Sequence, residues 1–577
     1  MDSNLLKTKS IERCVSDAED RGKSLRRSLT ALDLTLLGIG AIIGTGIFVL
    51  TGIAAANQAG PAIVVSYMVA GLACAFAALC YAEFASMLPV AGSAYTYAYA
   101  TLGEIFAWMI GWDLILEYAV GSMTVAIGWS GYFQRILAGF GIALPAWMAA
   151  APGAAPGSLI NLPAFIIVLL IMVLLVIGIR ESARFNAVMV TIKIAAVLFF
   201  LVAGVWYVQP ANWTPFMPYA WSGVMTGAAV VFFAYIGFDA VSTTAEEAKN
   251  PTRDLPIGII ASLVICTLLY VAVSAVLTGI VPVVDYRQDA QFLNAPVAYA
   301  LSVINLDWAA GLVSAGAVAG ITSVLLVMLM SQPRIFFAMS RDGLLPQGVS
   351  KVHPRFQTPY ITTIITCVIV AIVAALVPIQ VVGEMTSIGT LFAFVVVCLA
   401  VMVLRVTRPD THRPFRVPGG HVIPTLGVLS CLYLMVSLSV MTWVRLLVWL
   451  DIGMLIYWFY GRTHSPLADP REAAARSHGE GFSNTLKVAG YLLMFNGVAI
   501  TLLAFLTEWN VTTEALARWS ELDALTSRVG IRVTPEIADS FGLTILGAGV
   551  AVAAVGWVIG RAVGGASPRT PGSPAAR

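Results

Sequence analysis

The sequence predicts an all-α polytopic membrane protein of about 14 transmembrane helices, two of them discontinuous at bilayer depth. Three observations support this fold class. Hydrophobic residues make up 59% of the 577 residues and charged residues only 11%, whereas ordinary soluble domains carry about 25% charged residues. Apolar runs long enough to cross a bilayer recur along the chain. Glycines interrupt the first of these runs between residues 38 and 46, and the sixth at Gly237.

The apolar runs predict where the chain crosses the membrane. They cover residues 31–55, 61–87, 104–131, 160–179, 188–208, 222–245, 256–282, 309–332, 359–378, 384–404, 421–441, 444–461, 488–506 and 541–562. Of the 33 Lys and Arg residues, all but six are then on the side of the N-terminus, and the six are Arg135, Arg287, Arg445, Arg518, Arg528 and Arg532. Because loop Lys and Arg favour the cytoplasm, we expect a multi-pass protein of the plasma (inner) membrane with both termini cytoplasmic.

The same pattern predicts the organisation of the chain. We expect a cytoplasmic N-terminal segment 1–30, a core of ten helices in 31–404, accessory helices 11 and 12 in 405–462, a cytoplasmic loop 463–487, accessory helices 13 and 14 with an extracellular loop in 488–562, and a disordered tail 563–577. The tail is rich in Gly, Pro, Ala and Ser, a composition that does not bury a core.

Several function classes are disfavoured by composition. The five His residues fall in loops or at span edges, which argues against an intramembrane metal enzyme with His ligands. Six of the seven Cys residues lie in apolar runs, where free Cys acts as a small hydrophobe. The chain has no Gly-Lys-Thr phosphate loop, so ATP is not the expected energy source. We therefore expect no enzymatic activity, no metal and no cofactor.

The first predicted span contains Gly38, Gly40, Gly44 and Gly46. Each glycine weakens a helix by roughly 1 kcal/mol relative to alanine, so the helix is expected to break here. Broken backbone at this depth is stable only if it is buried in protein or lines a watery cavity. Free N–H groups at the start of one half-helix suit a carboxylate, and free carbonyls at the end of the other half suit an ammonium group. The break therefore predicts half of a receptor for a zwitterion.

A second break is predicted in the sixth span, five helices after the first. There the run 232–239 is interrupted by Gly237 and ends at Asp239. Two breaks at corresponding positions of two five-helix halves are typical of an inverted repeat, because an odd number of spans reverses the orientation of the second half. We expect the substrate to bind between the first and sixth spans.

Charged residues within the third and fifth spans are the candidates for ion coupling. Asp113 and Glu117 are four residues apart and share one helix face. Two carboxylates in a low-dielectric cavity cannot both stay ionised cheaply, so at least one is expected to take up a proton near neutral pH. Lys193 is the second candidate, and the alternative for this residue is that its long side chain reaches the cytoplasmic interface.

Five stretches of the chain carry a family resemblance. They are Gly38 to Gly52 (GIGAIIGTGIFVLTG), Tyr81 to Gly92 (YAEFASMLPVAG), Phe232 to Pro256 (FFAYIGFDAVSTTAEEAKNPTRDLP), Ala338 to Pro346 (AMSRDGLLP) and Arg413 to Gly419 (RPFRVPG). In order and detail they resemble the amino acid–polyamine–organocation superfamily and, within it, a bacterial member of the cationic amino acid transporter family. The resemblance implies the leucine-transporter fold, with ten helices in two inverted repeats followed by accessory helices.

The resemblance also implies how the first break binds substrate. Backbone N–H groups of Thr45 and Gly46 would bind the substrate carboxylate, and Gly44 would give the clearance that the ligand needs. The alternative for the glycines is close helix packing of the GxxxG kind, to which Gly40 and Gly44 conform.

The substrate ammonium group is implied to bind carbonyls at both breaks, namely those of Ile42, Phe233 and Ile236. A lysine in the position of Lys193 is implied to reach the broken first helix, where sodium-coupled relatives place a cation. Its ammonium group would contact free carbonyls in place of sodium, and its deprotonation would release them. Lys193 and Glu117 together favour proton coupling.

Three further residues are candidates for gating or for the pocket wall. Asp239 lies one turn beyond the second break, where it either gates the site or caps the broken helix. Thr322 and Ser323 in the eighth span either line the side-chain end of the pocket or bond to their own helix. Asp113 is grouped with these residues, since its carboxylate is expected to face the same cavity as Glu117.

These observations predict a secondary amino-acid permease that takes up L-amino acids by alternating access, with H⁺ as the driving ion. The substrate is either cationic, such as arginine or lysine, or small and neutral, such as alanine. The alternatives are a non-transporting amino-acid sensor of the same fold and a sodium-coupled or exchange carrier. The expected partners are an L-amino acid and the lipid bilayer, with no nucleic acid, and a small membrane subunit stays an open question.

Overall fold

The computed structural model describes residues 7–8, 29–88, 93–177, 183–243, 245, 248–346, 353, 359–438 and 440–465. Within these residues the chain is helical apart from its connections, and the only strand-like pairings are two isolated bridges, Leu29 with Ala248 and Ala149 with Asn161. The predicted spans 488–506 and 541–562 and the tail 563–577 lie outside the described residues.

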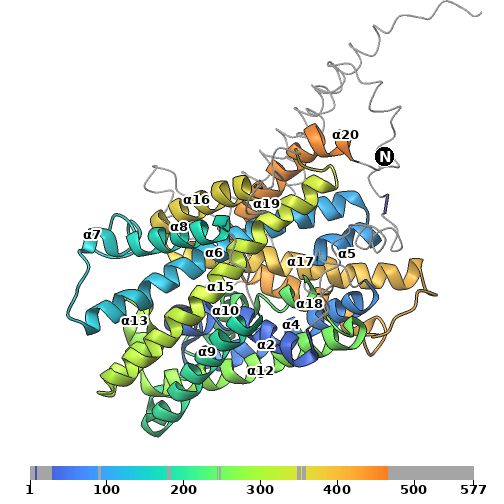
Figure 1. Cartoon of the computed structure of the whole chain (residues 1–577). Helices are drawn as coiled ribbons and strands as arrows, with labels where there is room; N and C mark the ends of the chain where they lie inside the picture. The colour runs from blue at the N-terminus through green and yellow to red at the C-terminus, as the bar shows by residue number, and fades with distance from the viewer. Residues whose placement is uncertain are drawn as a thin grey trace, which may run out of the picture. The chain divides into compact units, whose positions relative to one another are not determined.

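Each of the first twelve predicted spans lies on an apolar helix (Figure 1). The helices are α2 (Ala31–Ile42) continued by η1 (Gly46–Leu50), α3 (Thr51–Ala54) and η2 (Ala55–Ala59), then α4 (Ile63–Met87), α6 (Glu104–Gly139), α8 (Leu162–Ile177), α9 (Ala183–Gly204), α10 (Ala220–Val231) with η6 (Phe232–Tyr235), α12 (Pro251–Ile280), α15 (Asp307–Arg341), α16 (Tyr360–Leu376), α17 (Ile379–Thr407), α18 (Val422–Val436) and α19 (Val440–Ile456).

Short helices occupy the connections between the spans. They are η3 (Gly60–Ala62), α5 (Ser93–Thr101), α7 (Ala146–Ala149), η4 (Val205–Tyr207), η5 (Pro210–Trp213), α11 (Ala240–Thr243), η8 (Val283–Tyr286), α13 (Ala290–Asn294) and α14 (Pro296–Val303), and η10 (Tyr457–Gly461) and α20 (Arg462–His464) follow α19. Among the described residues, 7 helical segments are long and apolar enough to cross a membrane. The chain is therefore an all-helical, multi-pass membrane protein, and the total of about 14 spans stays a prediction.

The chain divides into two compact units, Met1–Arg341 with Leu345–Leu438 and Asp342–Leu344 with Ser439–Arg577. The first unit holds both helix breaks and every predicted site residue. In it α6 packs against α15 and α17, while α4 packs against α12 and α10. The half-helix α2 is enclosed by α12, α9 and α15. Large exposed apolar side chains, such as Ile166 and Leu170 of α8, suit a surface in contact with lipid.

The first helix breaks within the predicted glycine-rich stretch. α2 begins with a capping box, in which Thr30 and Asp33 satisfy each other's backbone N–H groups, and it ends at Ile42. Ile43 is extended (φ −74°, ψ 103°), and the helix resumes at Gly46 with a π-helical turn. The backbone around Ile43 is completely buried, which is the condition for irregular backbone at membrane depth.

The second break follows α10. A 3₁₀ turn over Phe232–Tyr235 ends at Ile236, whose backbone is extended. Gly237 has φ +121°, a conformation that side-chain-bearing residues rarely adopt. The chain becomes helical again at Ala240. The glycine predicted to interrupt this span is thus the residue at which the chain turns.

Two glycines let the breaks pack directly against each other. A Cβ atom built on Gly46 would lie 2.4 Å from the Cα of Ala234, and one built on Gly237 would lie 2.9 Å from the carbonyl carbon and oxygen of Ala41. Both distances are shorter than any ordinary van der Waals contact. The absence of side chains at these positions therefore sets the separation of the two broken helices.

We expect Gly46→Ala to destabilise the protein by about 1–3 kcal/mol or more, because the added methyl group meets backbone atoms of Ala234 that cannot move aside. The matched control is Gly311→Ala on α15, where a Cβ atom would meet nothing within 4 Å. Thermal unfolding in detergent measures the difference. Equal melting temperatures for the two variants would contradict the close packing of the breaks.

Candidate functional site

Lys193 of α9 is the cation at the first helix break. Its side chain is completely buried, and Nζ donates hydrogen bonds to the carbonyl oxygens of Gly40 at 2.5 Å and Ile43 at 3.0 Å. Gly320 of α15 makes room for the lysine stem, since a Cβ atom there would lie 2.9 Å from the lysine Cβ. The lysine thus does not extend to the membrane interface, and its ammonium group lies where the broken helix leaves carbonyls without helical partners.

The neighbouring Ser323 is tied to this cation. Its hydroxyl lies 3.2 Å from Nζ of Lys193 and donates to the carbonyl of Gly320 at 2.8 Å. The hydroxyl of Thr322 donates to the carbonyl of Val318 at 2.6 Å and accepts a bond from Nε1 of Trp129 at 2.9 Å. Both hydroxyls are therefore engaged within the protein, and a contact of either with a substrate stays a prediction.

The part of the site that is predicted to bind the substrate carboxylate lies at Thr45 and Gly46. The hydroxyl of Thr45 is buried and has no hydrogen-bond partner among the described residues. The side chain of Thr45 packs against α6 at Gly128, where an added Cβ atom would lie 2.3 Å from the threonine Cγ2. A Cβ atom built on Gly44 would lie 3.1 Å from Cγ2 of Val324 on α15, so there is little room for a side chain. An unpaired buried hydroxyl costs free energy unless a ligand or water completes it.

The predicted ammonium side of the site consists of carbonyls at both breaks. The carbonyl of Phe233 accepts the N–H of Ile236 at 3.2 Å, which leaves one of its two lone pairs for a further donor. The carbonyl of Ile42 accepts a bond from the hydroxyl of Tyr270 at 2.9 Å, and the same hydroxyl lies 2.6 Å from the carbonyl of Ala234. A hydroxyl carries one hydrogen, so only one of these two carbonyls is paired at a time.

Tyr270 belongs to a buried cluster of three tyrosines that sequence analysis did not identify. The ring centroids of Tyr67 and Tyr235 each lie 5.2 Å from that of Tyr270. The hydroxyl of Tyr67 lies 3.3 Å from the carbonyl of Gly46, and the hydroxyl of Tyr235 donates to the carbonyl of Tyr67 at 2.8 Å. The sequence does contain one sign of this cluster, namely tyrosines in the middle of apolar runs. A buried phenol needs a hydrogen-bond partner, so such a tyrosine indicates a polar contact between helices.

The two carboxylates of α6 lie apart from Lys193. Asp113 and Glu117 are both buried, and neither oxygen of Asp113 has a hydrogen-bond partner among the described residues. Asp113 packs against α17, where a Cβ atom on Gly389 would lie 3.0 Å from Oδ1. Glu117 is within electrostatic reach of both Asp113 and Asp239. Three carboxylates this close in a low-dielectric environment cannot all be ionised at low cost.

Asp239 holds the second break in place. Its Oδ1 accepts the backbone N–H of Gly237 at 3.2 Å, and its carbonyl accepts the hydroxyl of Ser242 at 2.6 Å. The carboxylate of Asp239 thus bonds within the loop of the second break, and both capping and gating stay predictions for this residue. The predicted residues form two groups, with Lys193 and Ser323 at the first break and the three carboxylates on the side of α6 and the second break.

The chain is similar to several known proteins. A family model described as amino acid permease matches residues 29–459. The branched-chain amino acid permease BcaP of Bacillus subtilis (strain 168) is 53% identical over 469 residues, which cover 81% of this chain and 100% of the relative. The methylthioribose transporter of the same strain is 49% identical over 81% of this chain and 99% of its own length.

A plant relative is more distant. The vacuolar cationic amino acid transporter 4 of Arabidopsis thaliana is 38% identical over 414 residues, which cover 71% of this chain and 68% of the relative. The family match ends at residue 459, so the predicted spans 488–506 and 541–562 lie beyond it.

We expect Tyr270→Phe to lower the free energy of unfolding by about 1–3 kcal/mol, since it leaves the buried carbonyls of Ile42 and Ala234 without their donor. Tyr433→Phe is the matched control, because Tyr433 is half exposed on α18. The two melting temperatures, measured in the same detergent, test the contact. No difference between the variants would show that the hydroxyl of Tyr270 does not hold the two breaks.

Proposed function

This chain belongs to the amino acid permease family, and from that premise we propose that it takes up L-amino acids by proton-coupled secondary transport. The relatives that define the family here are transporters rather than enzymes. The chemical task is therefore to bind a ligand within the bilayer, to expose it to each side in turn, and to link that change to the movement of an ion.

The observation that carries the proposal is the position of Lys193. Its ammonium group contacts the carbonyls of Gly40 and Ile43, a place where a monovalent cation would find oxygen ligands. A lysine ammonium group can release its proton and take it up again. Loss of the proton weakens its hold on the break, and rebinding restores it. A proton can thus replace sodium as the driving ion.

We propose the leucine-transporter fold for the first ten predicted spans, with the two broken helices at corresponding positions of an inverted repeat. Their direct packing, at Gly46 with Ala234 and at Gly237 with Ala41, supports this arrangement. We propose in addition the predicted division into a core 31–404, accessory helices and a terminal pair, with both termini cytoplasmic.

The substrate carboxylate is proposed to bind at Thr45 and Gly46, where a buried hydroxyl has no partner. The ammonium group of the substrate is proposed to bind the carbonyls of Ile42, Phe233 and Ile236. The carbonyl of Ile42 keeps a lone pair for the substrate even while it accepts the hydroxyl of Tyr270, and the 2.6 Å distance from that hydroxyl to the carbonyl of Ala234 offers it an alternative partner. Glu117 is proposed as the second proton-binding group, because it faces two further carboxylates.

We propose apolar L-amino acids with branched side chains as the first substrates to test. The most similar relative given above is a branched-chain amino acid permease, and the side chains of Phe233 and Ile236 at the second break are apolar. Alanine is the smaller neutral alternative. Arginine or lysine would need a carboxylate at the side-chain end of the pocket, for which Glu117 and Asp239 are the candidates. Methylthioribose is a second candidate, because a transporter of that compound is 49% identical to this chain.

We expect proteoliposomes with an inward proton gradient to accumulate radiolabelled L-leucine, and Lys193→Ala to lower this uptake at least tenfold because the break then lacks its exchangeable cation. Lys249→Ala is the matched control, since Lys249 is exposed. L-Alanine, L-arginine and methylthioribose serve as unlabelled competitors, and the strongest competitor identifies the substrate class.

Three results would contradict the proposal. Uptake driven by a sodium gradient and indifferent to Lys193→Ala would overturn the coupling ion. Binding of L-leucine without flux of any label would favour the sensor. Uptake of radiolabelled methylthioribose without uptake of L-leucine, L-alanine or L-arginine would overturn the assignment of an amino acid as substrate.

A further inference from the structure

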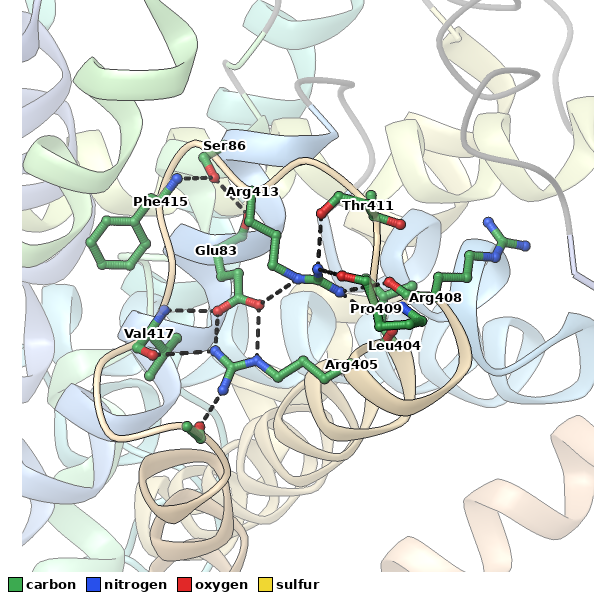
Figure 2. A network of polar contacts seen from close by, with 11 residues as sticks. Glu83, Ser86, Leu404, Arg405, Arg408, Pro409, Thr411, Arg413, Phe415 and Val417 are labelled. Atoms are coloured by element: carbon green, nitrogen blue, oxygen red, sulfur yellow. Dashed lines mark hydrogen bonds and ion pairs between the residues drawn. The ribbon is translucent and has the colours of Figure 1, made fainter.

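Two of the family-like stretches take no part in the proposed substrate site, and the structure brings them together (Figure 2). The first, 81–92, contains Glu83 near the end of α4. The second, 413–419, lies in the connection between α17 and α18. Arg405, in the last turn of α17, completes the group. The side chain of Glu83 is 2% exposed and that of Arg405 only 4%, so this ion pair is buried.

Arg405 binds Glu83 through one edge of its guanidinium group, with two parallel contacts. Its Nε donates to Oε1 of Glu83 at 3.2 Å, and its Nη2 forms a short ion pair with Oε2. The same guanidinium group donates to the carbonyls of Gly420 and, at 3.3 Å, Val417. Arg405 therefore links three chain segments, namely the ends of α4 and α17 and the connection that precedes α18.

Arg413 adds a second cation to the same carboxylate. Its Nε lies 3.4 Å from Oε1 of Glu83. Its Nη atoms cap the end of α17 by donating to carbonyl oxygens, namely those of Thr411 at 2.8 Å, Pro409 and Arg408 at 3.0 Å and Leu404 at 3.4 Å.

Backbone groups of the connection complete the network. Oε2 of Glu83 also accepts the backbone N–H of Val417 at 2.8 Å, and the N–H of Phe415 donates to Oγ of Ser86 at 3.2 Å. The connection is thus held to α4 at two residues as well as through the arginines.

Separating these groups would be costly. One carboxylate is the shared counter-ion of two guanidinium groups, so its withdrawal would leave two buried cations without a counter-charge, which is strongly destabilising. α4 also reaches the helix breaks, since the hydroxyl of Tyr67 lies 3.3 Å from the carbonyl of Gly46. Tyr67 is about 24 Å along the helix from Glu83.

We propose that Glu83, Arg405 and Arg413 form a permanent anchor that carries the end of α17 and the 408–421 connection along with α4 throughout the transport cycle. The three are positioning residues. They hold the end of the helix that contacts the first break and do not form a gate that opens in each cycle. That the anchor persists through a transport cycle rests on the proposed function. That the three residues form an anchor rests on their contacts alone.

The test is a disulfide between Ser86→Cys and Phe415→Cys, formed by mild oxidation in proteoliposomes, with each single variant as control. A permanent anchor predicts efficient cross-linking, equal yields with and without L-leucine and a proton gradient, and L-leucine uptake within twofold of the reduced double variant. Failure to cross-link, a yield that changes with conditions, or uptake that stops on oxidation and returns on reduction would each overturn the proposal.

A second comparison needs no cross-link. Glu83→Gln leaves two uncompensated guanidinium groups, whereas Arg413→Gln leaves a balanced pair, so Glu83→Gln is expected to lower the melting temperature and the uptake rate several times more than Arg413→Gln does. Equal effects would overturn the charge balance on which the anchor depends. Lack of L-leucine uptake by the wild type would count against the proposed function, while the cross-linking yields and melting temperatures would still decide the anchor.

Discussion

The structure depends on how backbone groups are satisfied where a helix breaks inside the membrane. Lipid offers them no hydrogen bonds, so the protein has to supply partners from other helices. At the first break it does so with the ammonium group of Lys193 on Gly40 and Ile43 and with the hydroxyl of Tyr270 on Ile42. Every residue that fills this role is fixed in place by the packing of α9, α12 and α15 around α2.

This constraint explains why the predicted residues form two groups. The break needs donors, so a cation and a phenol surround it, and acidic side chains would add further acceptors where donors are required. The carboxylates of Asp113 and Glu117 lie instead toward α17 and the second break. If Lys193 and Glu117 both exchange protons, as we propose, the two sites act through the same pair of broken helices, which touch at Gly46 and Ala234.

Sequence analysis predicted the features that depend on local composition. Glycines that weaken a helix marked both breaks, and the apolar runs located the helices that the structure describes, although α6 ends at Gly139 rather than 131 and α15 at Arg341 rather than 332. The contact of Lys193 with the first break followed only from the family resemblance, because a lysine near a helix end is as consistent with the membrane interface. The tyrosine cluster and the pairing of Glu83 with Arg405 were missed. Both depend on residues far apart in the chain, and a single sequence does not show which helices pack together.

We propose that the proton carried by Lys193 moves with the substrate. The most direct test records the internal pH of proteoliposomes with a trapped fluorescent indicator while L-leucine is added outside, with no ion gradient imposed. The account predicts that the interior acidifies as L-leucine enters through the wild type, and that Lys193→Met abolishes the acidification. Acidification that persists in this variant, or entry of L-leucine through the wild type without any change in pH, would contradict it.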